Sequence, residues 1–188
     1  DHQNLKGWTA LMYASKNGYE QVARALLEKG AEVDATDEEG WTALIWASQD
    51  GHEQVARALI DENANVNAAA NNGVSSLMLA SQNGHEQIAR ALLKEGANVN
   101  HSANDRRTAL MQASEYGRDK VARALLEAGA AVDATNNEGV TSLIKACENG
   151  HEQIALALLE RGANVNHSAK DRRTALMQAS EYGRDKVA

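Results

Sequence analysis

Six histidines and one cysteine are the residues of this chain whose side chains most often carry chemistry. Three of the histidines each follow a glycine, and their separations are 33 and 66 residues: His52, His85 and His151. Zinc ligands must converge to within about 2 Å of one ion, whereas this regular separation spreads the rings along the chain. His101 and His167 precede Asp105 and Asp171 in loops, where they could bind a metal only weakly. We therefore expect no metal site and interpret these two histidines as surface loop residues.

The lone cysteine, Cys147, has no partner for an intramolecular disulfide and no histidine near it in the sequence. It stands at a position that small hydroxyl residues hold elsewhere in the chain, namely Ser15, Ser48, Ser81, Ser114 and Ser180. This pattern predicts a buried spacer rather than a nucleophile. The sequence also contains no Walker-type loop, no dinucleotide fingerprint and no nucleophile elbow. We expect neither enzyme activity nor a cofactor.

The composition restricts the class of partner. Nineteen basic residues against 26 acidic ones give a formal charge of -7, which disfavours nonspecific binding to nucleic acid. No apolar run approaches the roughly 20 residues that span a bilayer, so no membrane contact is expected. A single cysteine and the absence of such a run favour a cytoplasmic, intracellular protein.

The elements that position these side chains follow from one period of 33 residues, which holds along the whole chain. One phase of the repeat is always leucine: Leu11, Leu44, Leu77, Leu110, Leu143 and Leu176. Two places earlier stands a hydroxyl residue, as in Thr9, Thr42, Ser75, Thr108, Thr141 and Thr174. Threonine and serine are favoured N-caps, so each of them predicts the start of a short helix.

Two glycine breaks divide each repeat into a pair of short helices, for example 42–50 and 53–62 in the second repeat. Asn63 replaces the glycine after the second helix, where a left-handed C-cap is expected. Such a small pair cannot bury its apolar stripe alone, so the pairs must stack and share a core. The pattern predicts a single domain over residues 1–188, with about five full repeats and a truncated sixth, phased at Gly7, Gly40, Gly73, Arg106, Gly139 and Arg172.

This arrangement resembles the ankyrin repeat over essentially the whole chain. The motif Thr-x-Leu-x-x-Ala occurs as Thr42, Leu44 and Ala47, then Gly51-His52 follows, and the closing Gly-Ala-x-Val-Asn occurs at residues 96–100. The resemblance implies an all-α solenoid of helix-turn-helix units linked by β-turn or hairpin fingers. It also implies a non-catalytic module that binds a partner protein or peptide on its concave finger and first-helix face.

The chain departs from the family pattern in two respects. It contains no proline, so the family's Thr-Pro-Leu-His box reads Thr-Ala-Leu-Met or Thr-Ala-Leu-Ile in four of the repeats, and the hydrogen bonds of the box histidine cannot form. Arg106 and Arg172 also stand where four other fingers have glycine. A positive φ would cost arginine free energy, so we expect either a different turn in those two fingers or a negative φ at this position throughout.

The residues expected to contact a partner are those that the resemblance places on the fingers and the exposed side of the first helices: Trp8, Tyr13, Trp41, Trp46, Leu79, Arg107, Gln112, Tyr116, Lys145, Arg173 and Tyr182. Tryptophan and arginine are typical hot-spot residues. Trp8 and Trp41 either contact the partner or cover the adjacent finger, whereas Trp46 is expected to face the groove. The arginines either bind acidic groups of a partner or pair with the chain's own Asp105, Glu115, Asp171 and Glu181.

Three other interpretations of the function stay open. The chain could be a regulatory or small-ligand-sensing segment of a larger enzyme, since some ankyrin domains belong to enzymes. It could be a designed scaffold, because residues 101–122 and 167–188 differ only at Asn104 and Lys170. Ala188 aligns with the interior of a second helix, so an uncapped apolar edge also predicts end-to-end self-association.

Overall fold

A computed structural model describes residues 3–4 and 6–181 of the chain. Two compact units make up the chain, Asp1–Asn98 and Val99–Ala188. That they form one continuous domain, as the repeat pattern predicts, stays a prediction. Within the described residues, no helix is long and apolar enough to cross a membrane.

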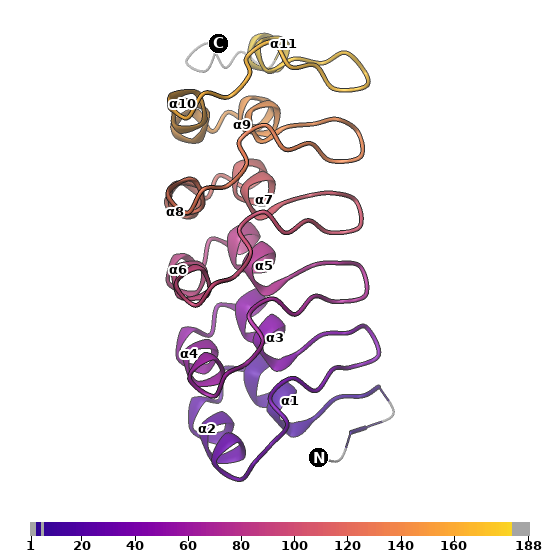
Figure 1. The fold of residues 1–188 in the computed structure, drawn as a ribbon, viewed down its shortest axis with the longest axis vertical. Helices are drawn as coiled ribbons and strands as arrows, with labels where there is room; N and C mark the ends of the chain where they lie inside the picture. The colour runs from indigo at the N-terminus through magenta and orange to yellow at the C-terminus, as the bar shows by residue number, and fades with distance from the viewer. Residues whose placement is uncertain (1–2, 5, 182–188) are drawn as a thin grey trace. The chain divides into compact units, whose positions relative to one another are not determined.

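The first unit contains three helix pairs: α1 (Ala10–Lys16) with α2 (Glu20–Glu28), α3 (Ala43–Asp50) with α4 (Glu53–Asp61), and α5 (Ser76–Asn83) with α6 (Glu86–Lys94). The first helices α1, α3 and α5 contact one another in one layer, and the second helices α2, α4 and α6 do so in another (Figure 1). Finger loops project from the side of the first helices (Figure 1).

The second unit repeats this plan with α7 (Ala109–Glu115), α8 (Asp119–Glu127), α9 (Ser142–Asn149), α10 (Glu152–Glu160) and α11 (Ala175–Glu181). Here α7 and α11 contact α9 in the layer of first helices, while α8 contacts α10 in the other layer. The predicted all-α fold of stacked helix pairs is thus confirmed in each unit.

The predicted helix ends are confirmed as well. Thr42 lies in extended conformation before α3, and its hydroxyl accepts a hydrogen bond from the N–H of Ile45 at 3.3 Å. Thr9, Thr108 and Thr141 cap their helices in the same way. After α4, Asn63 has a φ of 61°, so it takes the left-handed conformation that glycine supplies in other repeats.

The periodic leucines form the shared core. Leu11, Leu44, Leu77, Leu110 and Leu143 are each at most 4 % exposed. Burial of such a side chain contributes about 1.5–3 kcal/mol, so the leucine row holds each stack together. Leu176 differs from its equivalents and is 59 % exposed. Within the described residues, no later helix covers it.

Each finger after the first is a hairpin with a three-residue loop whose last member has a positive φ. In the fourth finger the N–H of Arg106 donates to the Ala103 carbonyl at 2.8 Å, and the N–H of Ala103 donates to the Arg107 carbonyl at 3.0 Å. This is a type I turn followed by a left-handed residue, the usual construction for that loop length. The expectation for the two arginines is therefore wrong in both of its forms, because Arg106 and Arg172 have φ values of 64° and 67° in the same turn as the glycines. The hairpin hydrogen bonds impose this conformation despite its cost.

Histidines join neighbouring repeats. The Nε2 atoms of His52, His85 and His151 lie 2.9–3.1 Å from the carbonyl oxygens of Lys16, Gln49 and Glu115, one repeat earlier in each case. A carbonyl only accepts, so Nε2 carries the proton and donates. The interpretation of His167 as a plain loop residue needs correction, because its Nε2 also lies 2.8 Å from the Gly139 carbonyl. These bonds supply the contacts between repeats that the missing box histidine cannot make.

Candidate partner-binding site

Four aromatic side chains of the first unit form a continuous cluster, which we call the aromatic cluster: Trp8, Tyr13, Trp41 and Trp46. The Trp46 ring lies between the other two indoles, with centroids 4.6 Å from Trp8 and 4.4 Å from Trp41. Tyr13 extends the cluster from Trp8, at 4.8 Å. The rings are tilted by 38–49°, an arrangement in which aromatic pairs attract beyond their area burial.

The local sequence explains why these rings meet. Trp8 and Trp41 stand just after the loops of two successive fingers, and Tyr13 and Trp46 stand one turn into the helices that follow. Stacking of the repeats then brings the finger of one repeat beside the first helix of the next. The three indoles are half-buried by one another, while Tyr13 is 49 % exposed. Trp8 and Trp41 thus cover their neighbours and still present surface, so the two predicted roles are compatible.

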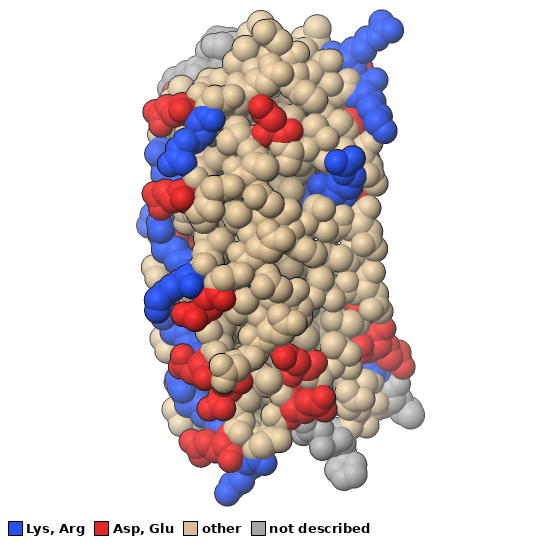
Figure 2. Space-filling view, viewed as in Figure 1, with Lys and Arg blue, Asp and Glu red and all other residues tan. Residues whose placement is uncertain are grey.

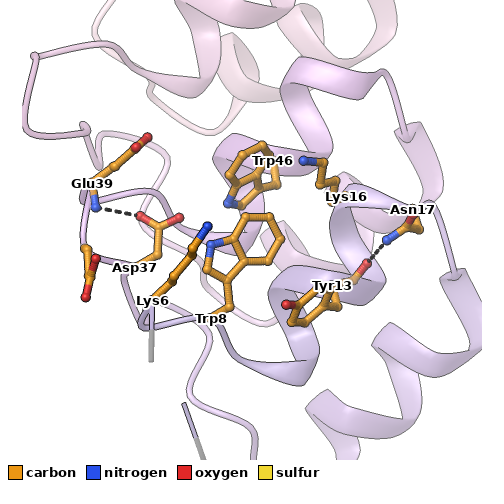
Figure 3. A pocket seen from close by; sticks show the side chains of 9 residues that line it. Lys6, Trp8, Tyr13, Lys16, Asn17, Asp37, Glu39 and Trp46 are labelled. Carbon is orange, nitrogen blue, oxygen red and sulfur yellow. Dashed lines mark hydrogen bonds between the residues drawn. The ribbon is translucent and has the colours of Figure 1, made fainter. Parts of the chain in front are cut away.

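Three members of the cluster, Trp8, Tyr13 and Trp46, form one wall of an open cavity of about 440 Å³, which we call the aromatic cavity (Figure 3). Its other lining residues come from two fingers and the end of α1: Lys6, Lys16, Asn17, Asp37, Glu38 and Glu39. The Lys16 ammonium lies 4.3 Å from the centroid of Trp46 and 5.2 Å from that of Trp8. A cation over an indole face is attracted by the ring quadrupole, so the rings already hold one positive charge.

Hydrogen bonds to its backbone fix the finger beside the cavity. Asp37 is buried, and its Oδ1 accepts from the N–H groups of Glu39 at 3.0 Å and Trp41 at 2.9 Å. The next finger adds two bonds, since Asn71 donates to the Glu38 and Glu39 carbonyls at 2.9 Å each. The carboxylates of Glu38 and Glu39 are exposed, and no cation among the described residues lies within ion-pair distance of them.

Charged residues of the second unit behave differently, because they form what we call the ion-pair network: Asp105, Arg107, Glu115, Lys145, Glu148, Asp171 and Arg173. Lys145 joins Glu115 and Glu148, at 3.2 Å each. Arg107 contacts Glu115 at 3.1 Å, and Arg173 contacts Glu148 at 3.5 Å. Of the two roles predicted for the arginines, the structure shows pairing with the chain's own carboxylates, with Glu148 as an acceptor that was not predicted.

Two predicted contact residues are not exposed. Leu79 and Gln112 are each 8 % exposed, so their placement on the open side of the first helices is wrong. Each first helix packs against the first helix of the adjacent repeat, and side chains of this length do not reach beyond that contact. Tyr116 is 44 % exposed, as predicted. Tyr182 lies outside the described residues.

Lys16, Glu38 and Glu39 line the aromatic cavity. The resemblance places them at finger and first-helix positions of the expected binding face, but they were not among the residues singled out there for contact with a partner. The signal for Lys16 is its place one turn after Tyr13, on the helix face that carries the aromatic cluster. For the two glutamates it is their position in the finger loop directly before Trp41. A search for hot-spot residue types favours tryptophan and arginine and passes over such neighbours.

Groups with catalytic potential are scarce in the described part of the chain. No three histidine, cysteine or acidic side chains lie close enough there to hold a metal ion. Cys147 is 2 % exposed, as predicted for a spacer, and burial raises the pKa of its thiol to about 11. The thiol is therefore protonated at neutral pH, in a state that is neither nucleophilic nor metal-binding.

Comparison with known proteins shows the family. The model of ankyrin repeats (3 copies) matches residues 1–70, 63–136 and 129–188, and the chain therefore belongs to the ankyrin repeat family. Members of this family are in general protein–protein interaction modules, and the fold is typically non-catalytic. Among curated proteins, no sequence matches this chain significantly.

Proposed function

We propose that this chain is a protein-binding module that holds a protein or peptide partner against its finger and first-helix face. The observation that carries the proposal is the aromatic cluster, of which Trp8, Trp46 and Tyr13 line an open cavity of about 440 Å³. Tryptophan and tyrosine are enriched among the hot-spot residues of protein interfaces, which cluster in well-packed pockets. The proposed secondary contacts are Arg107, Lys145, Tyr116 and Arg173. The two arginines and the lysine are secondary because they already pair with carboxylates of the chain.

Selection of peptides from a random library displayed on phage tests the proposal. We expect selected peptides to lose at least tenfold in affinity for Trp46→Ala, because truncating a hot-spot residue costs about 2 kcal/mol or more. Arg57→Ala is the matched control, since Arg57 lies on α4 and pairs there with Glu53 at 3.0 Å. Circular dichroism checks that each variant keeps its helices. Peptides that bind Trp46→Ala as well as the parent chain, or an absence of enriched peptides, would refute the proposal.

The small-ligand alternative has one observation in its favour, the volume of the aromatic cavity. Small-molecule sites occupy about 300–1,000 Å³, and about 440 Å³ falls in this range. Its walls are acidic and basic as well as aromatic, and they come from two surface fingers and from α1 and α3. Two observations together would favour this alternative. A small aromatic compound would bind the chain saturably, and the selected peptides would not compete with one another for the chain.

End-to-end self-association stays a prediction. Leu176 and Met177 of α11 are 59 % and 57 % exposed, so apolar surface is present on the last described helix. Sedimentation velocity at several protein concentrations tests it, with Leu176→Asp as the variant that abolishes any association through this helix.

A further inference from the structure

We infer that the aromatic cavity is a subsite for a basic side chain of the partner, which displaces Lys16 from the faces of Trp8 and Trp46. This inference rests on the proposed function, because it names the chemistry of the partner segment that enters the cavity. The occupant is an exposed peptide segment that carries arginine. Three independent features of the first unit support it: the bound lysine, the unpaired carboxylates and the contrast with the second unit.

The bound lysine shows that the rings accept a cation. Lys16 lies above both indoles, 4.3 Å from the centroid of Trp46 and 5.2 Å from that of Trp8. Among the described residues, no carboxylate lies within ion-pair distance of its ammonium. Its side chain is exposed, so the contact with the rings is its main attachment and is worth little. Lys16 is thus a weakly held cation that a ligand can replace.

The carboxylates of Glu38 and Glu39 offer an incoming cation an electrostatic attraction that Lys16 does not have. Glu38 and Glu39 line the same cavity from the finger, and their backbone is fixed by Asp37 and Asn71. No cation in the described part of the chain pairs with their carboxylates. In Figure 2 one group of acidic side chains lies at the edge of the first unit from which the fingers project. Because the two glutamates and the indoles line one cavity, a cation that enters it is attracted both by the rings and by these carboxylates. Lys16 contacts only the rings, so the incoming cation gains the additional attraction.

Guanidinium is the cation that fits this combination best. It is planar, stacks on aromatic faces, is weakly hydrated and donates in a fork that matches a carboxylate. The wall of tilted indoles and the two neighbouring glutamates offer both kinds of contact. An acidic segment would meet unpaired carboxylates instead, and like-charge contacts at an interface are unfavourable.

The second unit offers no equivalent subsite in its described part. Its carboxylates Glu115 and Glu148 already share Lys145, and Arg107 and Arg173 complete their pairing. A ligand cation there would have to displace ion pairs of 3.1–3.5 Å rather than one exposed lysine. The subsite for a basic side chain therefore belongs to the first unit.

Intrinsic fluorescence tests the inference directly, because the three tryptophans of the chain all belong to the aromatic cluster. The full chain is titrated with the peptides (Gly-Arg)4, (Gly-Ser)4 and (Gly-Glu)4, each blocked at both ends. We expect a saturable change with (Gly-Arg)4 alone. Glu38→Gln with Glu39→Gln weakens this binding about fivefold or more, whereas Glu28→Gln with Glu62→Gln, the same charge change on α2 and just after α4, weakens it less than twofold.

Lys16→Met provides the decisive comparison. Removal of the competing cation strengthens (Gly-Arg)4 binding, by about two- to fivefold beyond the effect of Lys6→Met. Lys6 lines the same cavity and its substitution changes the charge equally, but no cation–π contact joins it to the rings among the described residues. Equal effects of the two variants would overturn the displacement of Lys16.

Two further results would overturn the subsite itself: equal binding of (Gly-Glu)4 and (Gly-Arg)4, or the absence of a saturable change. If displayed peptides without basic residues still require Trp46 for binding, the cation subsite fails while the proposed function stands. If neither kind of peptide requires Trp46, both fail.

Discussion

Arg106→Gly should stabilise the second unit, because the finger forces Arg106 into a left-handed conformation with a φ of 64°. A residue with a Cβ loses about 1–2 kcal/mol there. Glycine removes this strain but adds about 0.5–1 kcal/mol of backbone entropy to the unfolded chain. The Arg106 side chain is exposed, and the N–H bond to Ala103 is kept in the variant. The net gain is therefore about 0.5–1 kcal/mol.

Guanidinium chloride unfolding followed by circular dichroism at 222 nm measures this gain, with Arg106→Ala as the matched control. Alanine also removes the arginine side chain but keeps the Cβ and hence the strain, so we expect it to leave the free energy of unfolding nearly unchanged. Amide hydrogen exchange in residues 99–110 shows whether the gain is local to the finger. Equal stabilisation by alanine and glycine would refute the argument from φ, as would destabilisation by glycine.

Replacement of a finger glycine by alanine tests both the positive φ and the space that the structure leaves for a Cβ. A Cβ on Gly139 would come no closer than 3.4 Å to Lys170, so Gly139→Ala should cost only the conformational strain, net about 0.5–1 kcal/mol. A Cβ on Gly40 would lie 2.7 Å from Asn71 Oδ1 and 3.0 Å from its backbone nitrogen. We expect Gly40→Ala to cost clearly more than Gly139→Ala, and equal costs would show that the fingers move apart freely.

Three further outcomes are expected. His85→Ala should destabilise the first unit by about 1 kcal/mol, because it removes the hydrogen bond to the preceding repeat. In Gly51→Ala the added Cβ would clash with the His85 ring. A double-mutant cycle measured by denaturation should therefore show that Gly51→Ala costs less in the His85→Ala background than alone. Lys145→Met should lower the free energy of unfolding by about 1–2 kcal/mol, less so in 1 M salt, because it leaves Glu115 and Glu148 without their shared cation. Cys147, with a pKa of about 11, should be thiolate in only about one molecule in a thousand at pH 8, so Ellman's reagent should react with it at an appreciable rate only in denaturant.

The helices could be predicted from the sequence because their determinants are local and repeated. A threonine or serine before each first helix and a left-handed residue after each second helix define the ends, as Thr42 and Asn63 show. The buried leucine row needed only the further argument that a small helix pair cannot hide its apolar stripe alone. These rules involve residues within one repeat or at a constant offset, so a period in the sequence is sufficient evidence for them.

The side-chain partners could not be predicted in the same way. Trp8 meets Trp46, and Glu115 meets Lys145, across offsets of 38 and 30 residues that depend on how far one repeat is shifted against the next. The exposure of Leu79 and Gln112 depended on the same shift, and periodicity alone does not contain it. For Arg106 a correct local preference was outweighed by the hydrogen bonds of the hairpin.

The finger surfaces of the first and second units differ more in whether their charged side chains pair with one another than in their composition. Both surfaces carry charged residues, yet in the second unit Lys145 is shared by two glutamates. A partner that bound there would gain only the difference in free energy between its own contacts and the ion pairs that it replaces. In the first unit Glu38 and Glu39 lack such a cation among the described residues, and Lys16 is held by rings alone. A partner's contacts there replace water and one weak attraction, so the same number of contacts yields more binding free energy. Unsatisfied charge beside an aromatic wall is therefore a better guide to the binding surface of this chain than the presence of arginine.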